Sequence, residues 1–276
     1  MKAINFWGLC LLILNGFSIK AQAQSGYAML GAIGKRDAKI WYHQSKTHYA
    51  QLEYWPSGDP VSVYKASISL DSAFGYCGTF ELSMLTPGRK YEFRINQHYQ
   101  GSFTTQSLWE WRTDPPALHI AFGSCAYLND PDFDRPGKSY GGEDEIFNSI
   151  ANKNPDAMIW LGDNVYFREG DWDSQAGMVN RYLQSREHAS LQKLWTTCPH
   201  YAIWDDHDFG PNDSNGSFVL KNTSLEVFRH FWCNPTTGVE SSKGICSMTR
   251  IGDIDFFFLD NRYHRTAPQY NHTPFL

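Results

Sequence analysis

The sequence lacks any run of lysine or arginine, a second long apolar segment after the first 23 residues, and any excess of glycine or proline. Its 276 residues include 24 Lys and Arg against 29 Asp and Glu, a formal net charge of −5. Without a basic run, specific binding to nucleic-acid phosphates is not expected. The 22 glycines and 13 prolines are ordinary numbers that exclude collagen-like and linker-like chains. The apolar residues, 42% of the chain, suffice for a packed core and exclude a disordered chain.

The first 23 residues indicate export. A basic start at Met1 and Lys2 precedes a mostly apolar stretch over residues 6–19 and a small-x-small pattern at residues 21–23. This order predicts a signal peptide cleaved near Ala23. A membrane anchor is the alternative, but the apolar stretch is shorter than the roughly 20 residues that span a bilayer. We expect a secreted or periplasmic protein whose mature chain has no transmembrane segment.

Export permits disulfides. Cys10 would leave with the signal peptide, and an odd number of cysteines remains, so at least one is unpaired or has another use. The remaining cysteines are Cys77, Cys125, Cys198, Cys233 and Cys246. Cys233 and Cys246 flank a loop rich in Gly, Ser and Thr and are the candidate bridge, whereas Cys125 is the candidate for another role.

Residues 24–112 show the alternation of apolar and polar residues that is typical of β-strands. Strands are predicted over residues 38–42, 48–54, 61–66, 78–82 and 90–95. Short strands separated by turn sequences predict a small antiparallel sandwich. Residues 85–91 resemble the turn before a late strand of fibronectin type III domains, in which a tyrosine, here Tyr91, packs across the sandwich corner. The expected first domain is an Ig- or fibronectin III-like β-sandwich.

Residues 104–116 are predicted to be a linker, after which apolar runs alternate with helical patterns. Strands are predicted over residues 119–124, 157–162, 200–204 and 254–259, and helices over residues 142–150, 175–196 and 223–232. Strands that alternate with helices predict a sheet with helices on its faces. The alternative for the fourth strand is antiparallel pairing with residues 248–251 through the turn at Gly252 and Asp253.

Each of these four strands ends in chemically reactive residues. The first leads to Cys125, the second to Asp163 and Tyr166, the third to the acidic segment 205–208 with its histidine, and the fourth to Arg262. Ligands of open α/β sheets bind beyond the carboxyl ends of the strands. We therefore expect these side chains to meet at one edge of the sheet.

So many carboxylates cannot all ionise at close range unless a polyvalent cation lies among them. A thiolate together with a phenolate favours ferric iron, because a free tyrosine has a pKa of roughly 10 and needs a strong Lewis acid to ionise at neutral pH. Carboxylates alone suit a hard ion such as calcium. The expected cofactors are Fe³⁺ and Ca²⁺ in a site of two or more metals, with other divalent metals as alternatives.

The residues at the strand ends also form a motif series. In order, the series is Gly123-Ser124-Cys125, Gly162-Asp163-x-x-Tyr166, Trp204-Asp205-Asp206-His207-Asp208 and Leu259-Asp260-x-Arg262-Tyr263. It resembles the motif series of PhoD-type alkaline phosphatases, which belong to the metallophosphoesterases, and its third block is the most specific. The resemblance implies a multidomain α+β chain, with an N-terminal β-sandwich ahead of an αββα catalytic domain over residues 118–276.

The resemblance implies a metal role for several of these residues. Asp163 would bridge two metals, Cys125 and Tyr166 would ligate a ferric ion, and Asp206 would bind the second metal. Asn180 is a weaker metal candidate, with a place on a helix surface as its alternative. Cys125 could instead be a buried small apolar residue or a disulfide partner, and Tyr166 could simply pack against the rim of the site.

The catalytic roles implied by the resemblance fall to His207 and Arg262. His207 would stabilise the transition state or protonate the leaving oxygen, and Arg262 would hold phosphate oxygens as a bidentate fork. A structural salt bridge is the alternative for Arg262, and turn or cap positions are the alternatives for Asp205 and Asp208. The implied reaction is hydrolysis of phosphate mono- or diesters, small or polymeric, by a metal-bound hydroxide.

The family also places metal ligands in a late Gly-Asp-x-His segment, and none follows Asp260. Residues 118–276 are therefore expected to be the N-terminal part of a longer catalytic domain. Such a chain, expected to be a monomer, would retain metal weakly and have impaired activity. The alternative function is that of a non-catalytic secreted β-sandwich binding protein with a degenerate or incomplete phosphatase domain.

Overall fold

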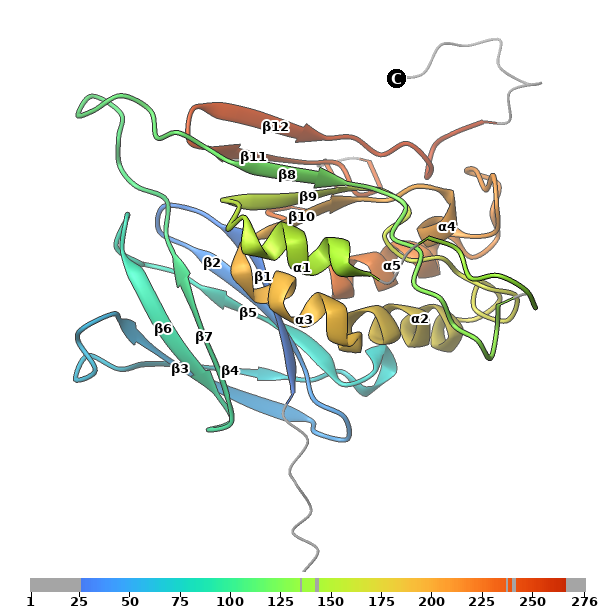
Figure 1. Ribbon diagram of the computed structural model, residues 1–276, viewed down its shortest axis with the longest axis horizontal. Helices are drawn as coiled ribbons and strands as arrows, with labels where there is room; N and C mark the ends of the chain where they lie inside the picture. The colour runs from blue at the N-terminus through green and yellow to red at the C-terminus, as the bar shows by residue number, and fades with distance from the viewer. Residues whose placement is uncertain (1–25, 135, 142–143, 237, 240–241, 267–276) are drawn as a thin grey trace, which may run out of the picture.

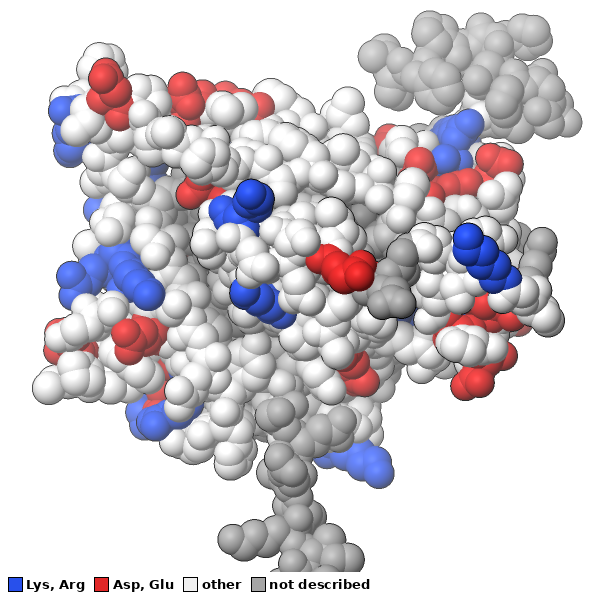
Figure 2. All heavy atoms as spheres, in the orientation of Figure 1, with Lys and Arg blue, Asp and Glu red and all other residues white. Residues whose placement is uncertain are grey.

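The computed structural model describes residues 26–266 with gaps at 135, 142–143, 237 and 240–241 (Figure 1). The predicted signal peptide and residues 267–276 lie outside the described residues. Within the described part, no helix has the length and apolar character needed to cross a membrane. On the face drawn in Figure 2, Lys and Arg are scattered among neutral side chains.

The N-terminal half is a β-sandwich of two antiparallel sheets. One sheet has the order β1 (Tyr27–Ile33), β2 (Ala38–His43), β5 (Cys77–Leu82); the other has the order β4 (Tyr64–Ser69), β3 (Tyr49–Pro56), β6 (Lys90–Ile95), β7 (Tyr99–Thr104). A 3-10 turn, η1 (Ser72–Phe74), precedes β5. Buried apolar side chains from both sheets, such as Ile40, Leu52 and Phe93, form one core between them. Tyr91 is buried and its hydroxyl accepts a hydrogen bond from the Thr86 N–H at 3.0 Å, as expected for the corner tyrosine.

The sandwich contains two strands that the alternation did not predict, β1 and β7. β1 is buried on both faces, so it shows no alternation of apolar and polar residues. β7 is a mostly polar edge strand with a glycine. The strand predicted over residues 61–66 begins three residues later, at Tyr64.

The second half contains a three-stranded parallel sheet in the order β10 (His200–Ile203), β9 (Ala157–Leu161), β8 (Ile120–Gly123). The linker predicted over residues 104–116 forms no strand or helix beyond the last residue of β7. The fourth predicted strand does not join the parallel sheet. It is β12 (Ile254–Phe258), which pairs antiparallel with β11 (Ser247–Ile251), so the hairpin alternative is correct.

Helices cover one side of the parallel sheet and the hairpin lies on the other side (Figure 1). The helices are α1 (Glu145–Asn152), α2 (Gln175–Glu187), α3 (Gln192–Thr197), α4 (Asp206–Phe209) and α5 (Lys221–Phe231), with the short 3-10 turn η2 (Ala189–Leu191). Met158 and Trp160 of β9 pack into the core on the helix side, and Ile159 packs on the hairpin side. The helical region predicted over residues 175–196 is divided, because the chain is extended at His188, between α2 and the η2–α3 segment.

The sandwich and the α/β part share one apolar core. Trp41 of β2 packs among residues of the helical layer, and its indole N–H donates to the His230 carbonyl at 2.8 Å. Arg186 of α2 is fully buried there, with its guanidinium carbon 4.3 Å from the centre of the Trp232 ring and 4.5 Å from that of Trp195. Burial lowers the pKa of Arg186 only to about 10, so it stays a cation held by aromatic faces. These contacts fix the sandwich against the layer that carries α2.

The predicted disulfide between Cys233 and Cys246 is not formed, and all five cysteines of the described chain are free. The Cys233 sulfur is buried against the Thr79 hydroxyl of β5 at 3.1 Å. The Cys246 sulfur accepts from the Asp260 N–H at 3.2 Å. Each sulfur therefore has its own partner, one in the sandwich interface and the other beside the loop after β12.

The sheet that carries the strand ends has a buried histidine in β10. His200 accepts from the Trp160 indole N–H at 2.9 Å, and its other nitrogen faces the Leu194 carbonyl at 2.9 Å. Burial lowers the pKa of His200 from 6.5 to about 3. Between these two pH values the unfolded chain binds a proton that the folded chain does not, so the free energy of unfolding falls as the pH falls.

Through this one proton, His200 makes the free energy of unfolding change by about 1.4 kcal/mol per pH unit in this range. We expect His200→Gln to remove this pH dependence. Urea unfolding of the wild type and the variant at several pH values between 4 and 7 measures it, with exposed His98→Gln as the control. Parallel pH profiles for the wild type and His200→Gln would show that His200 is not held neutral in the fold.

Candidate metal centre at the carboxyl edge of the parallel sheet

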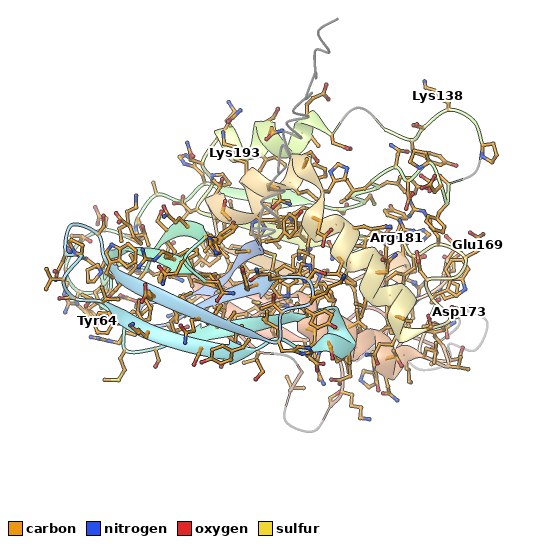
Figure 3. The ribbon with its side chains drawn as sticks, turned by 90° about the horizontal axis from the view of Figure 1, so that it is seen from below. Tyr64, Lys138, Glu169, Asp173, Arg181 and Lys193 are labelled. Carbon is orange, nitrogen blue, oxygen red and sulfur yellow. The ribbon has the colours of Figure 1, made fainter. Side chains whose placement is uncertain are left out.

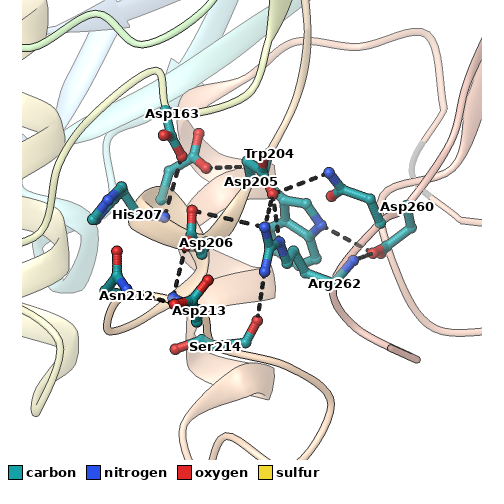
Figure 4. Close-up of polar contacts among 12 residues, drawn as sticks. Asp163, Trp204, Asp205, Asp206, His207, Asn212, Asp213, Ser214, Asp260 and Arg262 are labelled. Carbon is teal, nitrogen blue, oxygen red and sulfur yellow. Dashed lines mark hydrogen bonds and ion pairs between the residues drawn. The ribbon is translucent and has the colours of Figure 1, made fainter. Parts of the chain in front are cut away.

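The parallel strands bring the predicted site residues to one edge. Cys125 lies two residues after β8, Asp163 two residues after β9, and Asp206 opens α4 three residues after β10. Asp163, Asp206 and His207 each offer a ligand atom, and these atoms lie within 4.8 Å of one another (Figure 4). The structure thus brings together an Asp-Asp-His cluster that could hold a metal ion, and His207, expected to be a catalytic residue, is part of it.

Gly162 allows the ends of β9 and β10 to approach each other. Its φ is +100°, and a Cβ there would lie 2.7 Å from the Asp205 Cβ and 2.9 Å from the Asp205 nitrogen. Only glycine fits such an approach. Asp163 follows in a left-handed conformation with φ of +52°, and Cys125 also has a positive φ, +57°. Strained backbone of this kind persists where the surrounding structure holds it. Here the Cys125 N–H donates to the Gly162 carbonyl at 3.2 Å.

Asp163 lies at the centre of the cluster. It is only 9% exposed, and its carboxylate accepts from the His207 backbone N–H at 3.3 Å and from the Cys125 thiol at 3.8 Å. Burial raises the pKa of Asp163, and the negative charge of Asp206 raises it further. The surrounding protein alone therefore stabilises the Asp163 anion poorly.

Asp206 is stabilised as an anion by its neighbours. Although burial opposes it, the hydrogen bond from the Asp213 N–H, at 2.7 Å, and the nearby Arg262 guanidinium lower the pKa of Asp206. The protein thus favours the anion of Asp206 but not the anion of Asp163. A cation between them would stabilise both.

Tyr166 joins the cluster from the loop after β9. Its ring centre lies 4.4 Å from that of His207, with the planes tilted by 32°. Burial and a hydrogen bond with Cys125 both raise the pKa of Tyr166 well above its usual value. The protein alone therefore keeps the phenol protonated, and a strong Lewis acid would be needed to ionise it.

Arg262 lies beside the cluster, not inside it. Its guanidinium pairs with Asp205, donates to the Ser214 carbonyl at 3.0 Å, and lies 3.8 Å from the Asp206 carboxylate (Figure 4). The salt bridge that was the alternative for Arg262 is thus present. Its phosphate-binding role stays a prediction.

The other acidic and amide candidates lie elsewhere. Asn180 is exposed on α2, and the structure does not bring it into the cluster. Asp208 is fully buried and accepts from the Asp205 N–H at 2.6 Å, which is the cap role that was its alternative. Burial raises the pKa of Asp208 well above its usual value.

Two residues next to the cluster were missed. Asn164 donates its amide N–H₂ to Asp208 at 2.7 Å, and its buried carbonyl oxygen has no hydrogen-bond partner within the described chain. Asp213 donates its N–H to Asp206. The position of Asn164 directly after Asp163 was a usable signal, whereas the sequence 211–213 indicated only a turn. With carboxylate, imidazole, thiol, phenol and an unpartnered amide oxygen, this donor set fits metal ions.

The closeness of the Asp163 and Asp206 carboxylates should lower the stability of the metal-free protein. In metal-free buffer at neutral pH, we expect Asp163→Asn to raise the free energy of unfolding by about 1 kcal/mol, because it removes a buried carboxylate next to Asp206. Urea unfolding followed by circular dichroism measures this, and Asp253→Asn in the exposed β11–β12 turn is the control. An Asp163→Asn protein less stable than the wild type would contradict the crowding.

Comparisons by sequence find no match, neither to a family model nor to a curated protein. The structure matches the solved structure of PhoD with a TM-score of 0.69 at 16% identity, over 87% of this chain and 52% of that chain. The chain thus spans about half the length of the PhoD structure.

Smaller structures match parts of the chain. The sensor domain of the anti-sigma factor RsgI4 in Pseudobacteroides cellulosolvens covers 30% of this chain and is itself covered to 97%, at 21% identity and a TM-score of 0.25. Chicken CNTN1 FN1-FN3 domains cover 29%, with 31% of that chain covered, at 15% identity and a TM-score of 0.24. The match that carries weight covers most of the chain, and it shows that this protein has a PhoD-like fold, as the motif series predicts.

Proposed function

We infer that this chain is an exported, metal-dependent phosphoesterase of the PhoD type that hydrolyses phosphate mono- or diesters. The observation that carries this inference is the cluster of Asp163, Asp206 and His207, whose ligand atoms lie within 4.8 Å of one another in a PhoD-like fold. We assign residues 24–112 to a sandwich domain and residues 118–276 to the catalytic domain. This chain matches only about half of the PhoD structure, so its phosphoesterase activity is part of the proposal.

The donor set suggests which residues hold which metal. Cys125, Tyr166 and Asp163 suit Fe³⁺, because a thiolate and a phenolate form at neutral pH only next to a strong Lewis acid. Asp206, together with Asp163, suits Ca²⁺. When bound, such ions would supply Lewis-acid activation of water and stabilise charge on phosphoryl oxygens.

The side chains at the edge of the cluster divide the remaining work. We assign to His207 the protonation of the leaving oxygen. Its ring centre lies 4.4 Å from that of Tyr166, and its backbone N–H donates to Asp163. Arg262 is oriented by Asp205 and Ser214 next to Asp206, where its guanidinium can attract phosphate oxygens.

The test is hydrolysis of bis(4-nitrophenyl) phosphate and 4-nitrophenyl phosphate by the purified chain loaded with Fe³⁺ and Ca²⁺. We expect His207→Gln and Asp163→Asn each to lower kcat/KM by about a hundredfold or more, because one removes the proton donor and the other a metal ligand. Asp253→Asn should leave kcat/KM unchanged. A metal-loaded chain with no activity above buffer would instead support a non-catalytic secreted binding protein. Full activity of the Asp163→Asn variant would overturn the role of Asp163 as a metal ligand.

A further inference from the structure

An open cleft of about 700 Å³ begins at the metal cluster and leads away from it. His207 of the cluster and the neighbouring Tyr166 belong to its lining, and so do the aromatic residues Tyr127, Phe133, Tyr140 and Trp172. The cleft is thus continuous with the place where the proposed reaction occurs.

Aromatic rings follow one another along this cleft. From His207 the succession runs to Tyr166 at 4.4 Å between ring centres, to Tyr127 at a further 4.9 Å, and to Tyr140 at a further 5.0 Å. Tyr140 and Phe133 are 60% and 59% exposed. Exposed aromatic faces beside a reaction centre offer stacking surfaces to a flat group.

A set of ion pairs and backbone hydrogen bonds connects the loops that flank the cleft. Arg168 donates to Asp134 at 2.7 Å and through its backbone N–H to Asp171 at 2.7 Å, and Arg181 donates to Asp171 at 2.8 Å and to Asp130 at 3.1 Å. The Asp130 N–H closes the set by donating to Asp134 at 2.8 Å. Figure 3 shows Arg181 on α2, on the same side of the molecule as Glu169. These contacts join the loop after β8 to the loop after β9.

Arg168 and Asp134 also position the ring of Tyr127. The Arg168 guanidinium lies 4.2 Å from the centre of the Tyr127 ring, and the Tyr127 hydroxyl donates to Asp134 at 2.7 Å. Tyr127 is therefore held from its face and from its hydroxyl. The Tyr127 ring is thus set before any ligand enters, which lowers the entropy cost of stacking on it.

The charges of the cleft restrict its occupant further. Asp134 and Glu169 line it, and Arg168, the one arginine among the described residues of its lining, is already paired with Asp134. Such a lining disfavours a second anionic group, such as a further phosphate. It favours a neutral group with a flat face.

We propose that this cleft binds the leaving group of the phosphate ester, and that this group carries a flat aromatic or heteroaromatic ring, as in a nucleoside monophosphate. This inference rests on the proposed phosphoesterase function. In the reaction a water oxygen bonds to phosphorus while the ester P–O bond breaks. The electron pair stays on the leaving oxygen, which takes a proton, so the products are phosphate and a neutral alcohol. His207 lies where the cluster meets the cleft, beside the place of that oxygen.

The test compares adenosine 5′-monophosphate with glycerol 3-phosphate. Both release a primary alcohol, so a difference between them reports recognition of the ring, not leaving-group reactivity. We expect the double variant Tyr140→Ala and Phe133→Ala to lower kcat/KM for adenosine 5′-monophosphate about tenfold, because stacking is lost. The value for glycerol 3-phosphate should change by less than about twofold.

Two control variants distinguish loss of ring stacking in the cleft from a general effect of removing a tyrosine. Tyr140→Phe keeps the stacking face and should retain selectivity for adenosine 5′-monophosphate. Tyr49→Ala removes a tyrosine that is 50% exposed on β3 of the sandwich, and it should leave both substrates unaffected. Equal losses for both substrates in the double variant, or no loss for either, would overturn the role of the cleft.

Failure of the phosphoesterase proposal gives a different result. If the metal-loaded wild type hydrolyses neither ester, the proposed function is overturned, and calorimetric binding of benzylphosphonate against methylphosphonate then tests the cleft alone. Tighter binding of benzylphosphonate that the double variant abolishes would support the ring-binding cleft. Equal binding of the two phosphonates would overturn it.

Discussion

The parallel pairing of β8, β9 and β10 is the constraint on which the site depends. It brings Cys125, Asp163 and Asp206, from three distant parts of the sequence, to the same edge of one sheet. Gly162 makes the approach close, since any side chain there would overlap Asp205. As a result, burial and the charge of Asp206 disfavour Asp163 as a bare anion, and a bound cation would relieve both costs.

The remainder of the molecule holds this edge rigid. The sandwich shares its apolar core with the helical layer through Trp41 and the buried cation of Arg186, so β1 and β2 are covered on both faces. The ion pairs of Arg168 and Arg181 join the loops that follow β8 and β9. A site on loops needs such support, because small displacements weaken metal binding and catalysis.

Motif spacing predicted more of this protein than periodicity did. The series around Cys125, Asp163 and His207 predicted both the PhoD-like fold and the residues that meet, because parallel strands place their ends together. Periodicity failed where burial is two-sided, as in β1, and where the chain turns at His188 without proline or glycine. The Cys233–Cys246 pairing failed because loop composition carries no information on where each sulfur packs. Asp213 was missed because its contact with Asp206 depends on how separate loops meet, which no local pattern encodes, whereas the position of Asn164 directly after Asp163 was a usable signal.

The central claim is that the carboxyl edge of the parallel sheet is a metal centre built around Asp163. Anomalous diffraction at the iron edge, from crystals grown with Fe³⁺ and Ca²⁺, tests it most directly. The account predicts an iron peak within ligand distance of the Asp163 carboxylate, about 2 Å, on the side of Cys125 and Tyr166, with this peak lost in Asp163→Asn. Iron bound elsewhere on the protein, with no anomalous density at Asp163, would contradict it.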